Sequence, residues 1–285
     1  MFSQSVVELI KKRSSWRTYD GKPLVDEDRE QLQQYFAANS DGPFGTNMRF
    51  KLIDRMDEDG SEEEKLGTYG FIKGARTFVA GVNKEAEKDM ENYGYVFEKM
   101  VLFATELGLG TCWLGGTFTR SSFGKKAGIK EGETIPVVTP VGYGEAKRSI
   151  RDHVVRLAAG SKNRKPWEKL FFDGNFDTPL TEKEAGTFAT PLEMVRLGPS
   201  ASNKQPWIIV RDKNHGMFHF YVNRTRGYAK MLSFDIQKMD VGIAMCHFEL
   251  TANELNLSGQ WIDNNPGMPL PQSQMEYVIS WAAKE

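Results

Sequence analysis

The sequence predicts an α+β protein in which one plan of helices and strands occurs twice. Segments with helical spacing of apolar residues alternate with β-branched runs bounded by glycine, proline and asparagine. Residues from the first half recur in the same order in the second half. The 285 residues, 40% hydrophobic and 26% charged, suffice for one large or two smaller globular domains.

The expected elements of the first half begin with short helices and end in a strand. We predict helices over residues 3–12, 26–38 and 93–107 and strands over residues 49–54, 78–82 and 136–143. Asp26 is the expected N-cap of the second helix, and Gly108 the expected stop of the third. Residues 56–65 are acidic and are expected to be exposed. Residues 166–172 have the pattern of a short amphipathic helix.

Two separate stretches carry the internal repeat. Residues 26–53 match residues 182–209 without a gap, at an offset of 156. The run from Ala104 to Trp113 matches the run from Ala252 to Trp261, at an offset of 148. Helix–loop–strand units can look alike by chance, but two matches in the same order favour duplication. We therefore expect a first lobe over residues 1–172 and a second, shorter lobe over residues 173–285.

The two lobes are not equivalent. The second has no counterpart of the basic segment before residue 23, and no basic tail follows its last strand. A site that the first lobe begins would therefore have to be completed asymmetrically.

Composition excludes several classes of protein. The net charge of −1 gives no reason to expect a nucleic-acid or membrane partner. Cys112 and Cys246 are too few for a disulfide framework, and the four histidines form no metal-ligand spacing. No apolar stretch is long enough for a signal peptide or a membrane span. We expect a cytoplasmic protein without a metal.

A basic cluster follows the first predicted helix. Arg13, Ser14, Ser15 and Arg17 lie within a few residues of one another. Guanidinium groups bind phosphate oxygens in pairs, and hydroxyls add short hydrogen bonds. The alternative is a solvated basic helix end.

Three further segments carry polar groups or glycines in loops. Residues 198–207 place small hydroxyl residues and an amide before a strand, which is also the composition of an ordinary turn. Residues 108–116 end in Gly115 and Gly116, which allow close backbone approach to a ligand or simply a tight connection. Residues 162–166 form a short basic loop or a solvated charged face.

Together these segments resemble the nitroreductase family, most closely its two-halved branch of TM-type nitroreductases. The resemblance rests on KRSSWRTYD, ELGLGTCWLGG, PVGYGEA, KNRKP and, most specifically, PSASNKQPW, which occur in the family's order. It implies a nitroreductase-like α+β fold with a central mixed or antiparallel sheet flanked by helices. It also implies an intrachain pseudo-dimer, because each half keeps motifs that the other lacks.

The resemblance implies one non-covalent FMN site per chain. Family members are usually homodimers with FMN at the interface, whereas here one chain supplies both sides. A monomer is therefore sufficient, and the sequence does not decide whether the chain dimerises further. The residues that match the family's cofactor-binding positions are Arg13, Ser14, Ser15, Arg17, Leu114, Gly115, Gly116, Lys162, Arg164, Pro199, Ser200, Ala201 and Asn203.

The implied reaction is ping-pong hydride transfer. NADH or NADPH would reduce the flavin at N5, and a small organic acceptor such as a nitroaromatic or a quinone would then be reduced. No catalytic acid or base is required, and we assign none. The alternatives are another flavin reaction on the same scaffold, a flavin-binding or flavin-sensing protein with little turnover, and an interaction protein that has lost its flavin pocket.

Overall fold

The computed structural model describes residues 2–55, 66–145, 163–212, 214–225, 227–228 and 232–284. The chain divides into two compact units. Unit 1 comprises Met1–Gln4 and Lys12–Ala158, and unit 2 comprises Ser5–Lys11 and Ala159–Glu285. The boundary between the sequence repeats at residue 172 stays a prediction.

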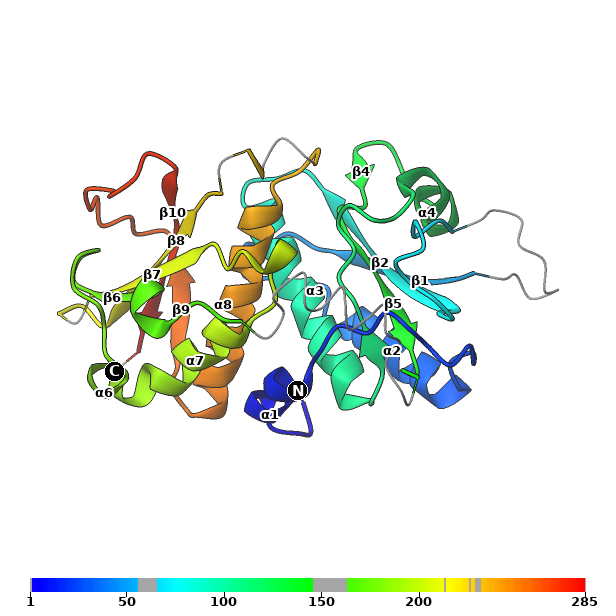
Figure 1. Cartoon of the computed structure of the whole chain (residues 1–285), viewed down its shortest axis with the longest axis horizontal. Coiled ribbons are helices and arrows are strands. Elements are labelled where there is room, and N and C mark those ends of the chain that lie inside the picture. The colour runs from blue at the N-terminus through cyan, green and yellow to red at the C-terminus, as the bar shows by residue number, and fades with distance from the viewer. Residues whose placement is uncertain are drawn as a thin grey trace. The chain divides into compact units, whose positions relative to one another are not determined.

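Unit 1 is an antiparallel sheet packed against helices (Figure 1). Its strands run in the order β1 (Arg49–Asp54), β2 (Thr77–Lys84), β5 (Val138–Gly142) and β3 (Gly110–Thr111), and β4 (Glu133–Thr134) pairs with β2. Its helices are α2 (Asp26–Ala38), α3 (Asp89–Glu106) and α4 (Arg120–Ala127). Helix α3 contacts α2, β2 and β3, and nearly all of its residues are buried. One part of the core of unit 1 therefore lies at α3, and a second apolar cluster, which includes Phe78 of β2 and Phe123 of α4, contains no residue of α3.

Unit 2 is a mixed sheet with helices on one of its faces. The strand order is β6 (Phe171–Asp173), β7 (Trp207–Asp212), β8 (Met217–Asn223), β10 (Met275–Ala283) and β9 (Gly259–Ile262). Only the β6–β7 pair is parallel. The helices are α1 (Val6–Lys12), of which Lys12 belongs to unit 1, α6 (Glu182–Ala185), α7 (Ala189–Leu197) and α8 (Ile236–Glu254), with 3₁₀ turns η1 (Trp167–Lys169), η2 (Gly186–Phe188) and η3 (Ala201–Asn203). Helix α8 packs against α7, β7 and β8.

Different residues pack on the two faces of the unit 2 sheet. Phe220 on β8 packs edge-on against Phe248 of α8, with ring centroids 5.4 Å apart. Its neighbour Tyr221 pairs in register with Ile208, and both belong to a second apolar cluster, against which Phe172 packs. Because successive strand residues point to opposite faces, this second cluster lies on the face away from α8.

The same plan underlies both units, as the sequence predicts. The order β1-β2-β5-β3 in unit 1 corresponds to β7-β8-β10-β9 in unit 2. The long helices end alike: the Leu109 N–H donates to Ala104 O and the Leu257 N–H to Ala252 O, both at 2.8 Å. Both ends turn through a left-handed residue, Gly108 with φ 78° and its counterpart Asn256 with φ 59°. The predicted α+β fold and its duplication are confirmed.

Most predicted elements of the first half are confirmed, and some details are wrong. Helix α2 and strand β1 have the predicted bounds. Asp26 is not the N-cap: Val25 holds that position without a side-chain hydrogen bond, and Asp26 lies in the first turn, where a carboxylate suits the helix dipole. Helix α4 was not predicted. The acidic residues 56–65 lie outside the described residues.

Two further helical segments expected from the sequence, one late in the first lobe and one in the second lobe, are also corrected. Residues 166–172 form the turn η1 and strand β6, because pairing with the edge of β7 outweighs the local helical pattern. The repeat places residues 182–194 over the predicted helix 26–38 and so implies one helix there, but the segment is divided into α6, η2 and α7. Gly186 causes this break, since its φ of 59° and ψ of −126° are incompatible with a helix. No helix in the described ranges has both the length and the apolar character needed to cross a bilayer.

Candidate functional site

In unit 1 the basic segment 13–17 lies beside the strand that leads into the glycine loop. Ser15 forms a parallel bridge with Thr111 on β3, and the Trp16 N–H donates to Thr111 O at 2.8 Å. Thr111 is followed within a few residues by Leu114, Gly115 and Gly116. Two segments that the sequence singles out separately are therefore brought together by backbone contacts.

The Trp16 side chain fixes this arrangement against two glycines. A Cβ atom at Gly110 would lie 2.9 Å from Trp16 Cγ, and one at Gly144 would lie 2.5 Å from Trp16 Cε3. Both distances are well below van der Waals contact, so the indole fits only because these residues are glycines. The Tyr19 hydroxyl lies 3.0 Å from Trp16 O and adds a polar contact to the same segment.

Arg13 is held by a buried carboxylate. Its side chain is 8% exposed, and its Nε atom lies 3.7 Å from Oε1 of Glu98, whose side chain is 0% exposed. The two groups form an ion pair, but 3.7 Å is too long for a hydrogen bond. The buried Nε–H of Arg13 has no hydrogen-bond partner within the described ranges. Trp113 Nε1 donates to the other Glu98 oxygen at 2.9 Å. Glu98 was not predicted, because its position in an apolar helix gives no motif.

The glycine loop is held rigidly at its start. Leu114 is buried and pairs with Val138, with an N–O distance of 2.9 Å. Gly115 O accepts a hydrogen bond of 2.6 Å from Arg120 Nη2, and burial lowers the pKa of Arg120. Gly116 is exposed. The loop thus presents an exposed glycine from a fixed position.

In unit 2 the loop from residue 199 to residue 206 has a strained backbone. Ser202, Asn203 and Gln205 have φ values of 48°, 54° and 45°, in the left-handed region that non-glycine residues rarely adopt. Ser200 Oγ accepts a hydrogen bond from the Gln205 N–H at 2.8 Å and closes the turn. Strain of this kind persists only where the surroundings fix the backbone, and it concentrates at binding sites.

Arg164 and Asn203 join the late basic segment to this loop. Arg164 Nη1 donates to Asn203 Oδ1 at 2.9 Å, while Nε and Nη2 donate to Leu197 O. Asn203 Nδ2 donates to Asn163 O at 2.8 Å. Both side chains therefore hold the loop, a role that the sequence did not predict. Contact of Arg164 with a phosphate stays a prediction, and Lys162 lies outside the described residues.

Asp240 on α8 hydrogen-bonds to the loop 199–206. Its Oδ1 accepts a hydrogen bond from the Ala201 N–H at 3.0 Å. Its Oδ2 is buried without a hydrogen-bond partner in the described chain, and burial, with a smaller contribution from Asp235, raises the pKa of Asp240 well above its usual range. Pro199 and Ser200, which precede Ala201, are half-buried.

Unit 1 contains a counterpart of this contact. Asn92 lies 148 residues before Asp240, at the offset of the second repeat. Its Oδ1 accepts from the Phe44 N–H at 3.2 Å, and its Nδ2 donates to Thr46 O at 2.9 Å. Each long helix thus holds its own loop through one buried polar side chain. Within the described ranges, no group of three His, Cys, Asp or Glu side chains could hold a metal ion.

Comparisons with known proteins identify a family and a fold. Residues 5–252 match the family model described as "Putative TM nitroreductase". A "putative nitroreductase" from Thermotoga maritima is similar in structure, with 18% identity and a TM-score of 0.61 over 99% of this chain and 95% of that one. The likeness to that structure shows the fold. A search of the curated proteins found no match.

Two further structures match about half of this chain. A nitroreductase with bound FMN from Bacteroides fragilis has 22% identity and a TM-score of 0.40, over 52% of this chain and 92% of that one. A "putative NADH oxidase" from Clostridium acetobutylicum has 21% identity and a TM-score of 0.37, over 49% of this chain and 89% of that one.

The packing of Trp16 predicts a position-specific effect of alanine. Gly144→Ala should lower the free energy of unfolding by about 1–3 kcal/mol, because the new methyl group overlaps the indole ring. Gly142→Ala, two residues earlier at the end of β5, is the control, since its Cβ would lie 3.5 Å from Tyr19 Cδ1, an ordinary contact. Urea unfolding followed by tryptophan fluorescence measures both. Equal effects of the two substitutions would contradict the packing.

Asp240→Asn tests the buried carboxyl through pH. The pKa of Asp240 is raised in the folded state, so folding favours its protonated form. This contribution to the free energy of unfolding is fully present below the ordinary pKa of 3.8 and is lost as pH rises through the folded-state pKa. Asparagine does not titrate and can still accept the Ala201 N–H. The variant should gain stability relative to the native chain as pH rises, by up to about 1.4 kcal/mol per pH unit. Urea unfolding between about pH 5 and pH 8 measures the difference, and a constant difference would refute the raised pKa.

Proposed function

Because the chain belongs to the family described as "Putative TM nitroreductase", we propose that it is an FMN-dependent oxidoreductase that takes electrons from NADH or NADPH. Family membership gives the coarse class, a nitroreductase-type oxidoreductase. FMN, the nicotinamide donor and the acceptor are the proposed parts. The observation that most directly supports FMN binding is the position of the basic segment 13–17, which is fixed beside the loop that contains the exposed Gly116.

The residues of unit 1 suit the phosphate end of FMN. Arg13 is cationic and nearly buried, and its Nε–H is without a hydrogen bond within the described ranges. A guanidinium held in place by Glu98 loses little conformational entropy when it binds an anion. Arg17, Ser14 and Ser15 would complete the phosphate and ribityl contacts, and the backbone of residues 114–116 would approach the flavin ring.

The residues of unit 2 suit the ring of the same FMN. The loop that contains Pro199, Ser200, Ala201 and Asn203 is fixed by Asp240 and Arg164, so its backbone groups are already in position before a ligand binds. Lys162 and Arg164 would add positive charge near the phosphate. We propose that the two sets of residues complete one FMN site per chain.

The chemistry supplied by bound FMN is hydride transfer from NADH or NADPH, at the flavin N5, to a small organic acceptor such as a nitroaromatic or a quinone. The chain's own residues bind and orient the cofactor. Positive charge from Arg13 and Arg17 favours an anionic ligand, and Trp16 keeps the basic segment on β3. We assign no residue as a catalytic acid or base, because the proposed reaction requires none from the protein.

Reduction of the bound flavin tests the proposed activity. The chain is saturated with FMN, freed of excess and mixed anaerobically with NADH or with NADPH. The visible absorption of oxidised flavin should disappear with at least one of the donors and return when a nitroaromatic or a quinone is added. Flavin that stays bound and oxidised with both donors would contradict the enzyme and support a flavin-binding or flavin-sensing protein.

Arg13→Gln tests the phosphate assignment. Loss of a charge-assisted contact should weaken FMN binding by about 10- to 100-fold, while riboflavin, which has no phosphate, should change by less than about threefold. Arg76→Gln, an exposed arginine of the same unit, is the matched control. Fluorescence titration gives both affinities. An equal loss for FMN and riboflavin would show that Arg13 does not contact the phosphate.

A further inference from the structure

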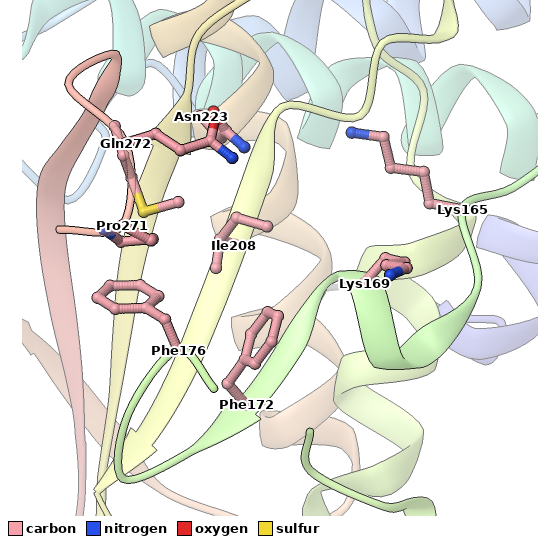
Figure 2. Close-up of a pocket in the computed structure, with 9 residues that line it drawn as sticks. Lys165, Lys169, Phe172, Phe176, Ile208, Asn223, Pro271 and Gln272 are labelled. Carbon is pink, nitrogen blue, oxygen red and sulfur yellow. The ribbon is translucent and has the colours of Figure 1, made fainter. Parts of the chain in front are cut away.

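Unit 2 contains a cavity on the sheet face away from α8 (Figure 2). Its volume is about 440 Å³, within the range of small-molecule sites. The side chains of Phe172 on β6 and Ile208 on β7 form an apolar floor. Ile208 belongs to the second apolar cluster of unit 2, and Phe172 packs against that cluster. All of the described lining residues belong to unit 2.

One side of the cavity is cationic. Lys165 and Lys169 line it, and the described lining residues include no aspartate or glutamate. Lys165 Nζ donates to Gln205 O at 3.0 Å, which leaves further N–H donors on the same ammonium group. Burial, and secondarily the charge of Lys204, lower the pKa of Lys165, so an anion beside it would be favourable. Lys169 is exposed at the side of the cavity.

The opposite side carries amides. Figure 2 shows Asn223 and Gln272 across the apolar floor from the two lysines, with Phe176 and Pro271 below them. Amide groups both donate and accept hydrogen bonds, whereas ammonium groups only donate. The cavity therefore combines a flat apolar surface, a positive side and a neutral polar side.

We propose that this cavity binds a small aromatic carboxylate, with its ring on Phe172 and Ile208 and its carboxylate toward Lys165 and Lys169. A neutral aromatic compound would leave both ammonium groups without a counter-charge. A small inorganic anion would leave the apolar floor exposed to water. An aromatic ring with one carboxylate satisfies both requirements. The proposal does not require FMN to bind, and Lys165 is the lining residue that also contacts the loop 199–206, through Gln205 O.

Calorimetric titration of the full chain with 2-naphthoate, in saturating FMN, tests the proposal. Naphthoate should bind with a stoichiometry of about one, and 2-naphthamide, its neutral analogue, should bind about 10-fold more weakly because it lacks the charge. Lys165→Met should weaken naphthoate binding about 10-fold, and Lys169→Met about threefold because Lys169 is exposed. Lys183→Met removes an exposed lysine of unit 2 that does not line the cavity and should leave the affinity unchanged.

Three results would overturn the proposal. Naphthoate could fail to bind, or could bind no better than naphthamide. Both cavity variants could bind as tightly as the native chain. Finally, naphthoate could bind and shift the visible spectrum of FMN in the native chain and in both variants alike, which would locate the probe at the flavin instead of at the lysines.

Discussion

The hydrogen bond from the Ala201 N–H to the buried carboxyl of Asp240 is the contact on which the unit 2 loop depends. The loop holds three non-glycine residues in the left-handed region, a conformation that costs on the order of 1–3 kcal/mol per residue and requires fixed surroundings. Asp240 anchors one end from α8, and Arg164 anchors the other through Asn203 and Leu197 O. In unit 1, Asn92 accepts a hydrogen bond from the backbone N–H of Phe44 in the corresponding loop. The contact between long helix and loop is therefore part of the repeated plan and occurs in both units.

The two units keep this common plan but present different chemistry. Unit 1 adds the segment 13–17, which Trp16 attaches to β3 through a backbone hydrogen bond and through space left by Gly110 and Gly144. Unit 2 adds strand β6 beside β7 and fixes the late basic segment against its loop. Among the residues that the structure describes, neither unit contains a counterpart of the other's addition. The proposal of a single FMN site rests on this division of residues between the units.

The sequence predicted the elements whose signals are local. Strand β1 and helix α2 were predicted with their bounds, and Gly108 follows the end of α3 as expected. Strand β6 was predicted as a helix, because its conformation follows from pairing with β7, a partner distant in the sequence. Among the site residues, Arg13 and Asn203 stand out by motif, whereas Glu98 and Asp240 lie in apolar helices. Their importance comes from what they contact, which only the folded structure shows.

The stoichiometry of FMN binding tests the central claim most directly. Isothermal titration of the full chain with FMN counts the sites without reference to any reaction. The account predicts about one FMN per chain, and predicts that Ser200→Trp in unit 2 and Arg13→Gln in unit 1 each weaken binding at that same site. Two FMN per chain, or a second set of sites that survives both substitutions, would show that each unit binds its own cofactor. No binding would show that the complementary halves do not form a flavin site.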